Sequence, residues 1–116
     1  MVILGSSIEG FDFEGFEIRD YTPGFEAGSS VAEIVAPAGI RHSRAHSTLN
    51  VKLYWVLEGT VDFEIGGVEA TLAVGDLPVV PRGTSFTYAA GDAPAGLLLV
   101  HTPPFSLEHE IFEREA

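Results

Sequence analysis

The sequence predicts an all-β protein, a sandwich or a barrel built as one domain. Thirteen glycines and seven prolines punctuate the chain of 116 residues, and they recur about every eight to twelve positions, as turns between short strands do. The segments between them are rich in β-branched and aromatic side chains, which favour strands. With 46% hydrophobic and 20% charged residues the chain can bury a core, and its length suits one domain and not two.

Eight segments have the composition of strands. Gly66 and Gly67 separate two of them and predict a two-residue hairpin, because glycine tolerates the positive φ angles of such turns. Residues 61–65 alternate between apolar and polar, which indicates one buried and one exposed face. Residues 97–100 are all apolar and fit a central strand. The expected strands are Phe16–Tyr21, Ser29–Ala36, His46–Leu57, Thr60–Ile65, Val68–Ala73, Leu77–Val80, Thr84–Ala89 and Leu97–Thr102.

The two ends of the chain flank this region. The tail, residues 106–116, is rich in helix formers, and Ser106 stands where an N-cap would; the alternative is an extended segment lying on a partner subunit. The arm, residues 1–28, carries Phe11, Phe13 and Phe16, which we expect to pack on the barrel or across a dimer. Because these rings and the apolar residues of the tail need cover, we expect a homodimer.

The charge balance excludes two classes of partner. Six lysines and arginines stand against 17 acidic residues, giving a net charge of −11. Binding to nucleic acid needs the opposite balance, and an anionic membrane surface would repel this chain. No apolar run approaches the roughly 20 residues that span a bilayer, and the N-terminus lacks the basic start of a secretory signal. We therefore expect a cytoplasmic domain whose partner is a small molecule or another protein.

Cysteine is absent, so other side chains must carry any chemistry. Three of the six lysines and arginines and two of the four histidines lie within residues 41–52. Such a concentration of positive charge suits an anionic ligand, although Arg41 and Arg44 could instead pair with surface carboxylates. His42 and His46 are four apart, and in an extended chain this places them about 13 Å apart, too far for one metal ion.

Lys52 is the only lysine in the chain, and it lies within an expected strand. One interpretation places it on the exposed face of that strand. The other places it inward, where a carboxylate partner or a lowered pKa must offset its burial. A buried lysine of lowered pKa can act as a base or form a Schiff base.

Two spaced motifs give the chain a resemblance to a known family. The run Gly75-x5-Pro81-x-Gly83-x2-Phe86 resembles the second cupin motif. The run His46-x-Thr48-x3-Lys52-x6-Gly59 resembles the first. This resemblance covers about residues 29–105 and implies a double-stranded β-helix, a barrel of two packed antiparallel sheets. It makes the chain similar to the small, single-domain cupins.

The same motifs depart from the family at the metal ligands. The four positions that hold a metal ion in metal-binding cupins correspond here to His46, Thr48, Lys52 and Phe86. Of these only His46 is a good ligand, and the Lys52 ammonium would repel a divalent cation. The resemblance therefore implies no metal and no other cofactor, while an irregular site using His42, His101 or Glu33 stays open.

The resemblance also bears on Lys52 and its surroundings. The family has an inward-pointing glutamate at this position, so Lys52 is expected to point inward, holding an anionic ligand or pairing with Glu33. Tyr54 shares its face by the strand period of two, and Tyr88 shares a face with Phe86. The candidate catalytic residues are Lys52, His46 and Tyr54, and the candidate ligand-binding residues are Thr48, Phe86, Arg44, His42, Tyr88 and His101.

Three functions remain open at this point. The first is a metal-independent isomerase, epimerase, cyclase or lyase acting on a small polar, anionic or carbonyl-containing molecule. The second is a barrel that binds such a molecule without catalysis. The third is a metal-dependent oxygenase with an irregular site, against which the loss of three ligands argues.

Overall fold

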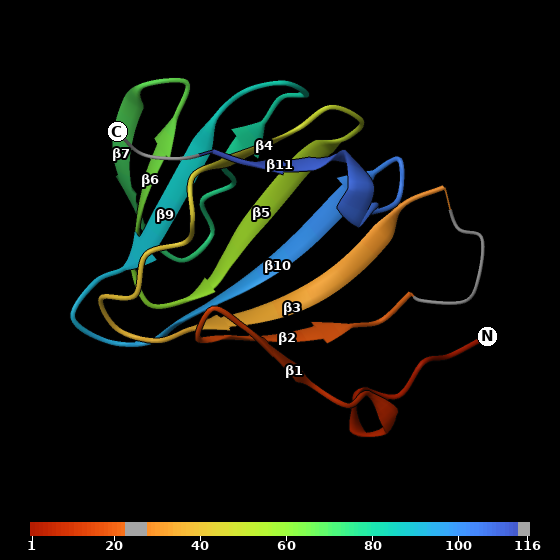
Figure 1. Ribbon diagram of the computed structural model, residues 1–116. Helices are drawn as coiled ribbons and strands as arrows, with labels where there is room; N and C mark the ends of the chain where they lie inside the picture. The colour runs from red at the N-terminus through yellow and green to blue at the C-terminus, as the bar shows by residue number, and fades with distance from the viewer. Residues whose placement is uncertain (23–27, 114–116) are drawn as a thin grey trace.

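The computed structural model describes residues 1–22 and 28–113, and it confirms an all-β architecture of two antiparallel sheets that face each other (Figure 1). The six-stranded sheet has the order β1 (Phe11–Phe13), β2 (Phe16–Asp20), β3 (Ser30–Ala36), β10 (Ala95–Thr102), β5 (Val51–Glu58) and β8 (Val79–Val80). The five-stranded sheet has the order β11 (Glu110–Phe112), β4 (Ala45–Ser47), β9 (Phe86–Ala90), β6 (Val61–Ile65) and β7 (Val68–Leu72). Two single turns of 3₁₀-helix, η1 (Gly5–Ser7) and η2 (Leu107–His109), complete the described elements.

The core lies between the two sheets, and strand alternation decides which side chains enter it. On β5 the side chains of Lys52, Tyr54 and Val56 are buried, whereas Trp55 is 51% exposed on the outer face. On β10, which pairs with both β3 and β5, alternate residues are likewise buried. The expected central position of this strand is confirmed.

The hairpin between β6 and β7 confirms the predicted turn. Gly66 and Gly67 have φ angles of 57° and 82°, both in the left-handed region that a two-residue hairpin of type I′ requires. The flanking residues Ile65 and Val68 are paired across the strands.

One expected strand, His46–Leu57, is in fact two. The chain turns after Ser47, so that β4 joins one sheet and β5 the other. The Ser47 hydroxyl oxygen accepts hydrogen bonds from the backbone N–H groups of Leu49 and Asn50, at 3.1 and 3.0 Å. A serine side chain that satisfies two backbone donors stabilises a turn, and this ends β4 where the apolar pattern alone predicts continuity.

Residues 106–113 of the tail do not form the predicted helix, and residues 114–116 lie outside the described part of the chain. After η2 the tail forms β11, which pairs antiparallel with β4 of the same chain through Ile111 and His46. The alternative of an extended segment is correct in conformation, but its partner strand is in this chain and not in another subunit. A helix of about eleven residues is only marginally stable alone, whereas the exposed edge of β4 offers backbone hydrogen bonds.

The N-terminal arm packs on the barrel in part. Phe16 is buried, and Phe13 contacts Phe112 with ring centroids 5.8 Å apart. Phe11 remains half-exposed. Within residues 1–22 and 28–113 no helix is long and apolar enough to cross a membrane; the cytoplasmic location stays a prediction.

Candidate functional site

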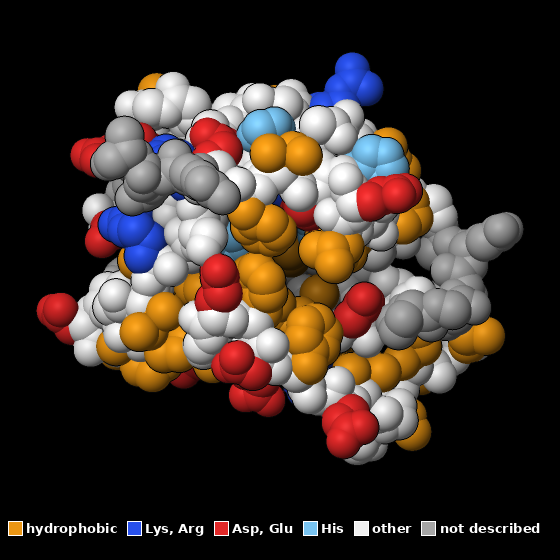
Figure 2. Space-filling view, viewed as in Figure 1, with side chains coloured by type: hydrophobic (Ala, Val, Ile, Leu, Met, Phe, Trp, Pro, Cys, Tyr) orange, Lys and Arg blue, Asp and Glu red, His pale blue; other side chains and the backbone are white. Residues whose placement is uncertain are grey.

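A pocket of about 290 Å³ opens between the sheets. Its wall is formed mainly by aromatic and aliphatic side chains from β1, β2, β3, β5, β9 and β10, and the tail closes one side. Figure 2 shows apolar side chains gathered around a hollow on this face of the molecule. A small set of polar groups interrupts the apolar wall, as is usual for sites that bind small molecules.

The first polar group, the histidine–tyrosine cluster, consists of His42, Tyr54 and Tyr88. The His42 ring stacks on Tyr88 with centroids 5.0 Å apart, and Tyr54 meets Tyr88 edge-on at 5.3 Å. His42 lies in the loop between β3 and β4. Its backbone N–H donates to the Tyr88 carbonyl at 2.8 Å, and the Thr87 hydroxyl donates to its carbonyl, so β9 fixes the loop at this point.

The surroundings of His42 make it a neutral base. Burial lowers its pKa from the usual 6.5, although the contact with Ser43 and the charge of Glu14 oppose this shift. Its Nδ1 lies 2.6 Å from the Ser43 carbonyl oxygen. Because a carbonyl only accepts, Nδ1 must carry the proton and donate it. The neutral ring therefore has a free lone pair on Nε2.

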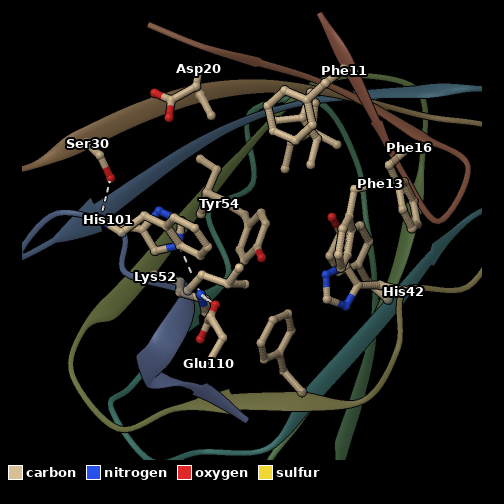
Figure 3. A pocket seen from close by; sticks show the side chains of 18 of the residues that line it. Phe11, Phe13, Phe16, Asp20, Ser30, His42, Lys52, Tyr54, His101 and Glu110 are labelled. Carbon is tan, nitrogen blue, oxygen red and sulfur yellow. Dashed lines mark hydrogen bonds and ion pairs between the residues drawn. The ribbon is translucent and has the colours of Figure 1, made fainter. Parts of the chain in front are cut away.

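The two tyrosines of this cluster are protonated donors. Both are fully buried, and burial raises the pKa of Tyr54 and of Tyr88 well above the ordinary value for a phenol. Figure 3 shows the Tyr54 hydroxyl pointing into the pocket. At neutral pH each hydroxyl can donate a hydrogen bond to a ligand oxygen or supply a proton to it.

The second polar group, the lysine cluster, consists of Lys52, His101 and Glu110 (Figure 3). Lys52 and His101 are paired across β5 and β10, and Glu110 reaches them from β11 of the other sheet. Lys52 Nζ lies 2.9 Å from His101 Nε2 and contacts Glu110 Oε1. The Lys52 side chain is 2% exposed and that of Glu110 is 9% exposed.

Charge and burial define the protonation of this cluster. Burial lowers the pKa of Lys52, while the hydrogen bond and the negative charge of Glu110 oppose that shift. Burial, with a smaller effect from the Lys52 charge, lowers the pKa of His101 to about 3. His101 is therefore neutral at physiological pH, and its Nε2 accepts a hydrogen bond from Lys52.

Phe86 stands between the two clusters. Its ring centroid lies 5.3 Å from that of His42 and 6.0 Å from that of Tyr54. The Lys52 ammonium lies 5.7 Å from the same ring. A ligand in the pocket would thus have a base and two phenols at one end, an apolar surface in the middle and an ion pair at the other end.

The structure brings six of the nine candidate residues to this pocket and leaves three outside. The six are His42, Lys52, Tyr54, Phe86, Tyr88 and His101. His46 is turned outward because its neighbours Ala45 and Ser47 are the buried residues of β4. Its Nδ1 donates to Glu113 Oε2 at 3.0 Å. The interpretation of His46 as a catalytic residue of the pocket is therefore wrong in position.

Arg44 and Thr48 also lie elsewhere. Arg44 forms an ion pair with Glu64 at 2.8 Å, which agrees with the alternative that the arginines pair with surface carboxylates. Thr48 is exposed, and its hydroxyl donates to the His109 carbonyl at 3.3 Å. Neither residue lines the pocket.

The prediction that Glu33 pairs with Lys52 is also wrong. Glu33 pairs with Arg19 at 3.4 Å, on the outer face of the six-stranded sheet. On β3 it is the even-numbered residues Ser30, Ala32 and Ile34 that line the pocket, so Glu33 has the wrong parity. Glu110 takes its place. Nothing in the sequence singles out Glu110 among 17 acidic residues; the only signal is that a buried lysine requires some carboxylate.

The side chains at the four metal-ligand positions do not fit a metal ion. His46 faces outward, Thr48 is exposed, Lys52 is an ammonium engaged by Glu110, and Phe86 has no donor atom. Among residues 1–22 and 28–113 no three side chains of His, Asp or Glu gather as a metal would need. The irregular alternative finds no support in position either, because His42 and His101 belong to different clusters and Glu33 lies outside the pocket.

Comparison with known proteins places the chain among cupin structures. A family model described as "Cupin domain" matches residues 31–101. A sequence search of curated proteins finds no match. Among solved structures, Streptomyces Pac13, described as a unique nucleoside dehydratase, superposes with a TM-score of 0.86 at 18% identity, over 98% of this chain and 91% of that chain. Three variants of Pac13, one replacing a histidine by glutamine and two replacing a tyrosine by phenylalanine, were solved with uridine.

Two other solved structures show the same fold. KdgF from Halomonas sp. has a TM-score of 0.80 at 15% identity, over 89% of this chain and 93% of that chain. A predicted oxalate decarboxylase from Thermotoga maritima has a TM-score of 0.78 at 17% identity, over 89% and 99%. At these identities the likeness establishes the fold and not the activity.

Proposed function

The chain belongs to the cupin family, and we propose that it is a metal-independent lyase that removes water from a nucleoside-like substrate carrying a carbonyl group. The observation that carries this proposal is the histidine–tyrosine cluster, in which a neutral imidazole stacks against one of two buried, protonated phenols inside an apolar pocket. A base and an acid held together in this way are what an elimination of water needs.

The comparison with Pac13 supports the reaction class. The histidine and the two tyrosines replaced in the uridine-bound Pac13 variants are spaced along that chain as His42, Tyr54 and Tyr88 are spaced here, to within one residue. These are also the three residues that meet in the pocket of this chain. The fold similarity spans almost the whole of both chains.

The chemistry follows from the protonation states. A carbonyl acidifies the adjacent C–H bond, and His42 Nε2 is the base that would remove this proton. As the C–H electrons form a carbon–carbon double bond, the bond to the hydroxyl on the next carbon breaks. The proton returned from His42 or from a tyrosine leaves with that hydroxyl as water. A phenol that donates to the carbonyl oxygen stabilises the negative charge that develops on it.

The apolar wall contributes to the same step. Because burial keeps the pKa of His42 below 6.5, the ring is mostly unprotonated at neutral pH and available as a base. Hydrogen bonds from Tyr54 and Tyr88 are stronger where water is excluded. The lysine cluster at the other end would bind the part of the substrate that does not react.

The test is a turnover assay on nucleosides that carry a carbonyl on the sugar, read by mass spectrometry as the loss of one water. We expect turnover by the wild-type protein without added metal, and we expect His42→Gln to abolish turnover while it still binds uridine. The alternative of a non-catalytic binding barrel is favoured if the protein binds these compounds and never converts them. Turnover that depends on a stoichiometric metal, measured by elemental analysis, would contradict the metal-independent part of the proposal.

A further inference from the structure

A buried carboxylate oxygen of the pocket has no hydrogen-bond partner among the described residues. Glu110 Oε2 is buried and has no partner within the described part of the chain, although Oε1 of the same carboxylate contacts Lys52. Glu110 lines the pocket, and its side chain is 9% exposed. Buried carboxylate oxygens are nearly always hydrogen-bonded, because an unpaired one loses its hydration without compensation.

The rest of the lysine cluster holds this carboxylate in place. Lys52 Nζ is engaged by Glu110 Oε1 and by His101 Nε2. The aromatic rings of Phe86 and Phe105 flank it, with centroids at 5.7 and 5.9 Å. The charge of Lys52 is thus balanced from within the protein, and among the described residues that line the pocket Oε2 is the buried side-chain atom without a partner.

We propose that Glu110 is a substrate-binding residue whose Oε2 accepts a hydrogen bond from a neutral donor of the ligand, a hydroxyl or an N–H group. A carboxylate oxygen only accepts, so it selects donors and repels anionic groups. This inference deepens the proposed function, on which it rests: in a nucleoside the matching donors are a ribose hydroxyl or the ring N–H of a pyrimidine. It differs from the anionic ligand expected from the sequence, because Glu110 already occupies the anion position beside Lys52.

Lys52 and His101 have a positioning role in this proposal. The ammonium contacts Oε1 of Glu110 and so holds the carboxylate in one orientation. His101, held neutral, fixes one hydrogen of that ammonium. Neither residue needs to contact the ligand for Glu110 to do so.

The first experiment measures binding of uridine, 2′-deoxyuridine, 3′-deoxyuridine and 3-methyluridine by calorimetry. In the wild-type protein we expect one analogue, the one that lacks the recognised donor, to bind roughly 10- to 100-fold more weakly than uridine. We expect the Glu110→Gln variant to bind uridine more weakly than the wild-type protein by a similar factor. This variant should bind uridine and that analogue with equal affinity. The same affinities for all four compounds in both proteins would overturn the proposal.

Two further proteins serve as controls. Glu113→Gln changes a carboxylate of the same tail that lies outside the pocket and contacts His46 and Ser85, and it should leave all affinities unchanged. Because Glu110→Gln leaves Lys52 charged and without a carboxylate partner, the double variant Lys52→Met/Glu110→Leu removes both charges and every acceptor of residue 110, and it should show the same loss of discrimination. A double variant that still discriminates as the wild-type protein does would also overturn the proposal.

A second experiment separates the failure of this inference from the failure of the nucleoside assignment. Ligand-detected NMR compares small neutral alcohols and amides with small carboxylates as fragments. Neutral donors that bind the wild-type protein and not Glu110→Gln support the role of Glu110 even where uridine does not bind, which would count against the nucleoside assignment alone. A wild-type preference for carboxylates, or no binding of neutral donors, overturns the role of Glu110.

Discussion

The rings of His42 and Tyr88 stack with centroids 5.0 Å apart and planes inclined by 24°. The two residues are 46 positions apart in the chain, yet the backbone N–H of His42 also donates to the Tyr88 carbonyl. The two residues that the proposed reaction uses as base and acid are therefore fixed to each other through both backbone and side chain. Such mutual positioning is what lets a proton leave a substrate and another return to it without rearrangement of the site.

The pH dependence of turnover should report on His42. A base works only when it is unprotonated, and burial lowers the pKa of this ring below 6.5. We expect kcat to be level across neutral pH and to fall tenfold per unit only below a midpoint that lies under pH 6.5. A pH–rate profile with an acid limb centred above pH 7 would contradict the role of His42. The His42→Gln variant should still bind uridine, but it should lose its activity and with it the acid limb of the pH–rate profile.

Replacing Lys52 should cost stability as well as binding. Lys52→Met would leave the Glu110 carboxylate buried without its partner, and breaking a buried pair destabilises by about 3–5 kcal/mol. Urea unfolding of the single variant should show this loss. The double variant Lys52→Met/Glu110→Gln should recover much of it, since no uncompensated charge remains. If both proteins unfold at the same urea concentration as the wild type, the ion pair is not a structural element of the pocket.

The outward pair of His46 and Glu113 should behave differently. Their side chains are 28% and 29% exposed, and side-chain pairs that water reaches in this way contribute about 0–1 kcal/mol. His46→Gln should therefore change the free energy of unfolding by less than about 1 kcal/mol and leave kcat and KM unchanged. A large loss of turnover would reinstate the sequence-based assignment of His46 to the catalytic residues.

The comparison of these residues shows how far the sequence could lead. The glycine–proline rhythm predicts an all-β sandwich or barrel, and strand alternation places Lys52 and Tyr54 on one face, because both depend on local pattern alone. The cupin barrel and the inward direction of Lys52 follow from the resemblance to the cupin motifs. Strand alternation does not predict the direction of the His46 side chain, because β4 has only three residues and ends in a turn made by Ser47. The place of Glu110 in the pocket could not be predicted either, because it depends on the pairing of β11 with β4. These strands are more than sixty residues apart in the chain, and no local pattern encodes their pairing.

Stability should fall in acid because of His101. Its pKa is about 3 in the folded chain and near 6.5 when unfolded. The unfolded chain therefore binds one more proton than the folded chain between these two pH values. The contribution of neutral His101 to the free energy of unfolding is complete above pH 6.5 and is lost as the pH falls towards 3. The expected slope is up to about 1.4 kcal/mol per pH unit from this group. His101→Gln should flatten the acid limb of a urea-unfolding series measured between pH 7 and 4. An unchanged limb would mean that His101 titrates normally.

We expect the two copies of the homodimer predicted from the sequence to meet at the outer face of the six-stranded sheet. There Trp55 is paired with Leu98 across β5 and β10, and Leu53 is paired with both Val100 and Val79, which forms a continuous apolar stripe. A second copy of the chain is a simple cover for such a stripe, because a two-fold contact repeats one surface on itself.

Trp55 is the only tryptophan, so its fluorescence reports on this face alone. We expect light scattering to give twice the chain mass of 12.4 kDa at micromolar concentration. Dilution to monomer should move the Trp55 emission to longer wavelength as water replaces the second copy. Trp55→Lys should give a monomer, since the substitution would bury two unpaired charges in the interface. A dimer whose Trp55 emission does not change on dilution would place the contact elsewhere, at the phenylalanines of the arm and tail. A 12.4 kDa particle would contradict the homodimer itself.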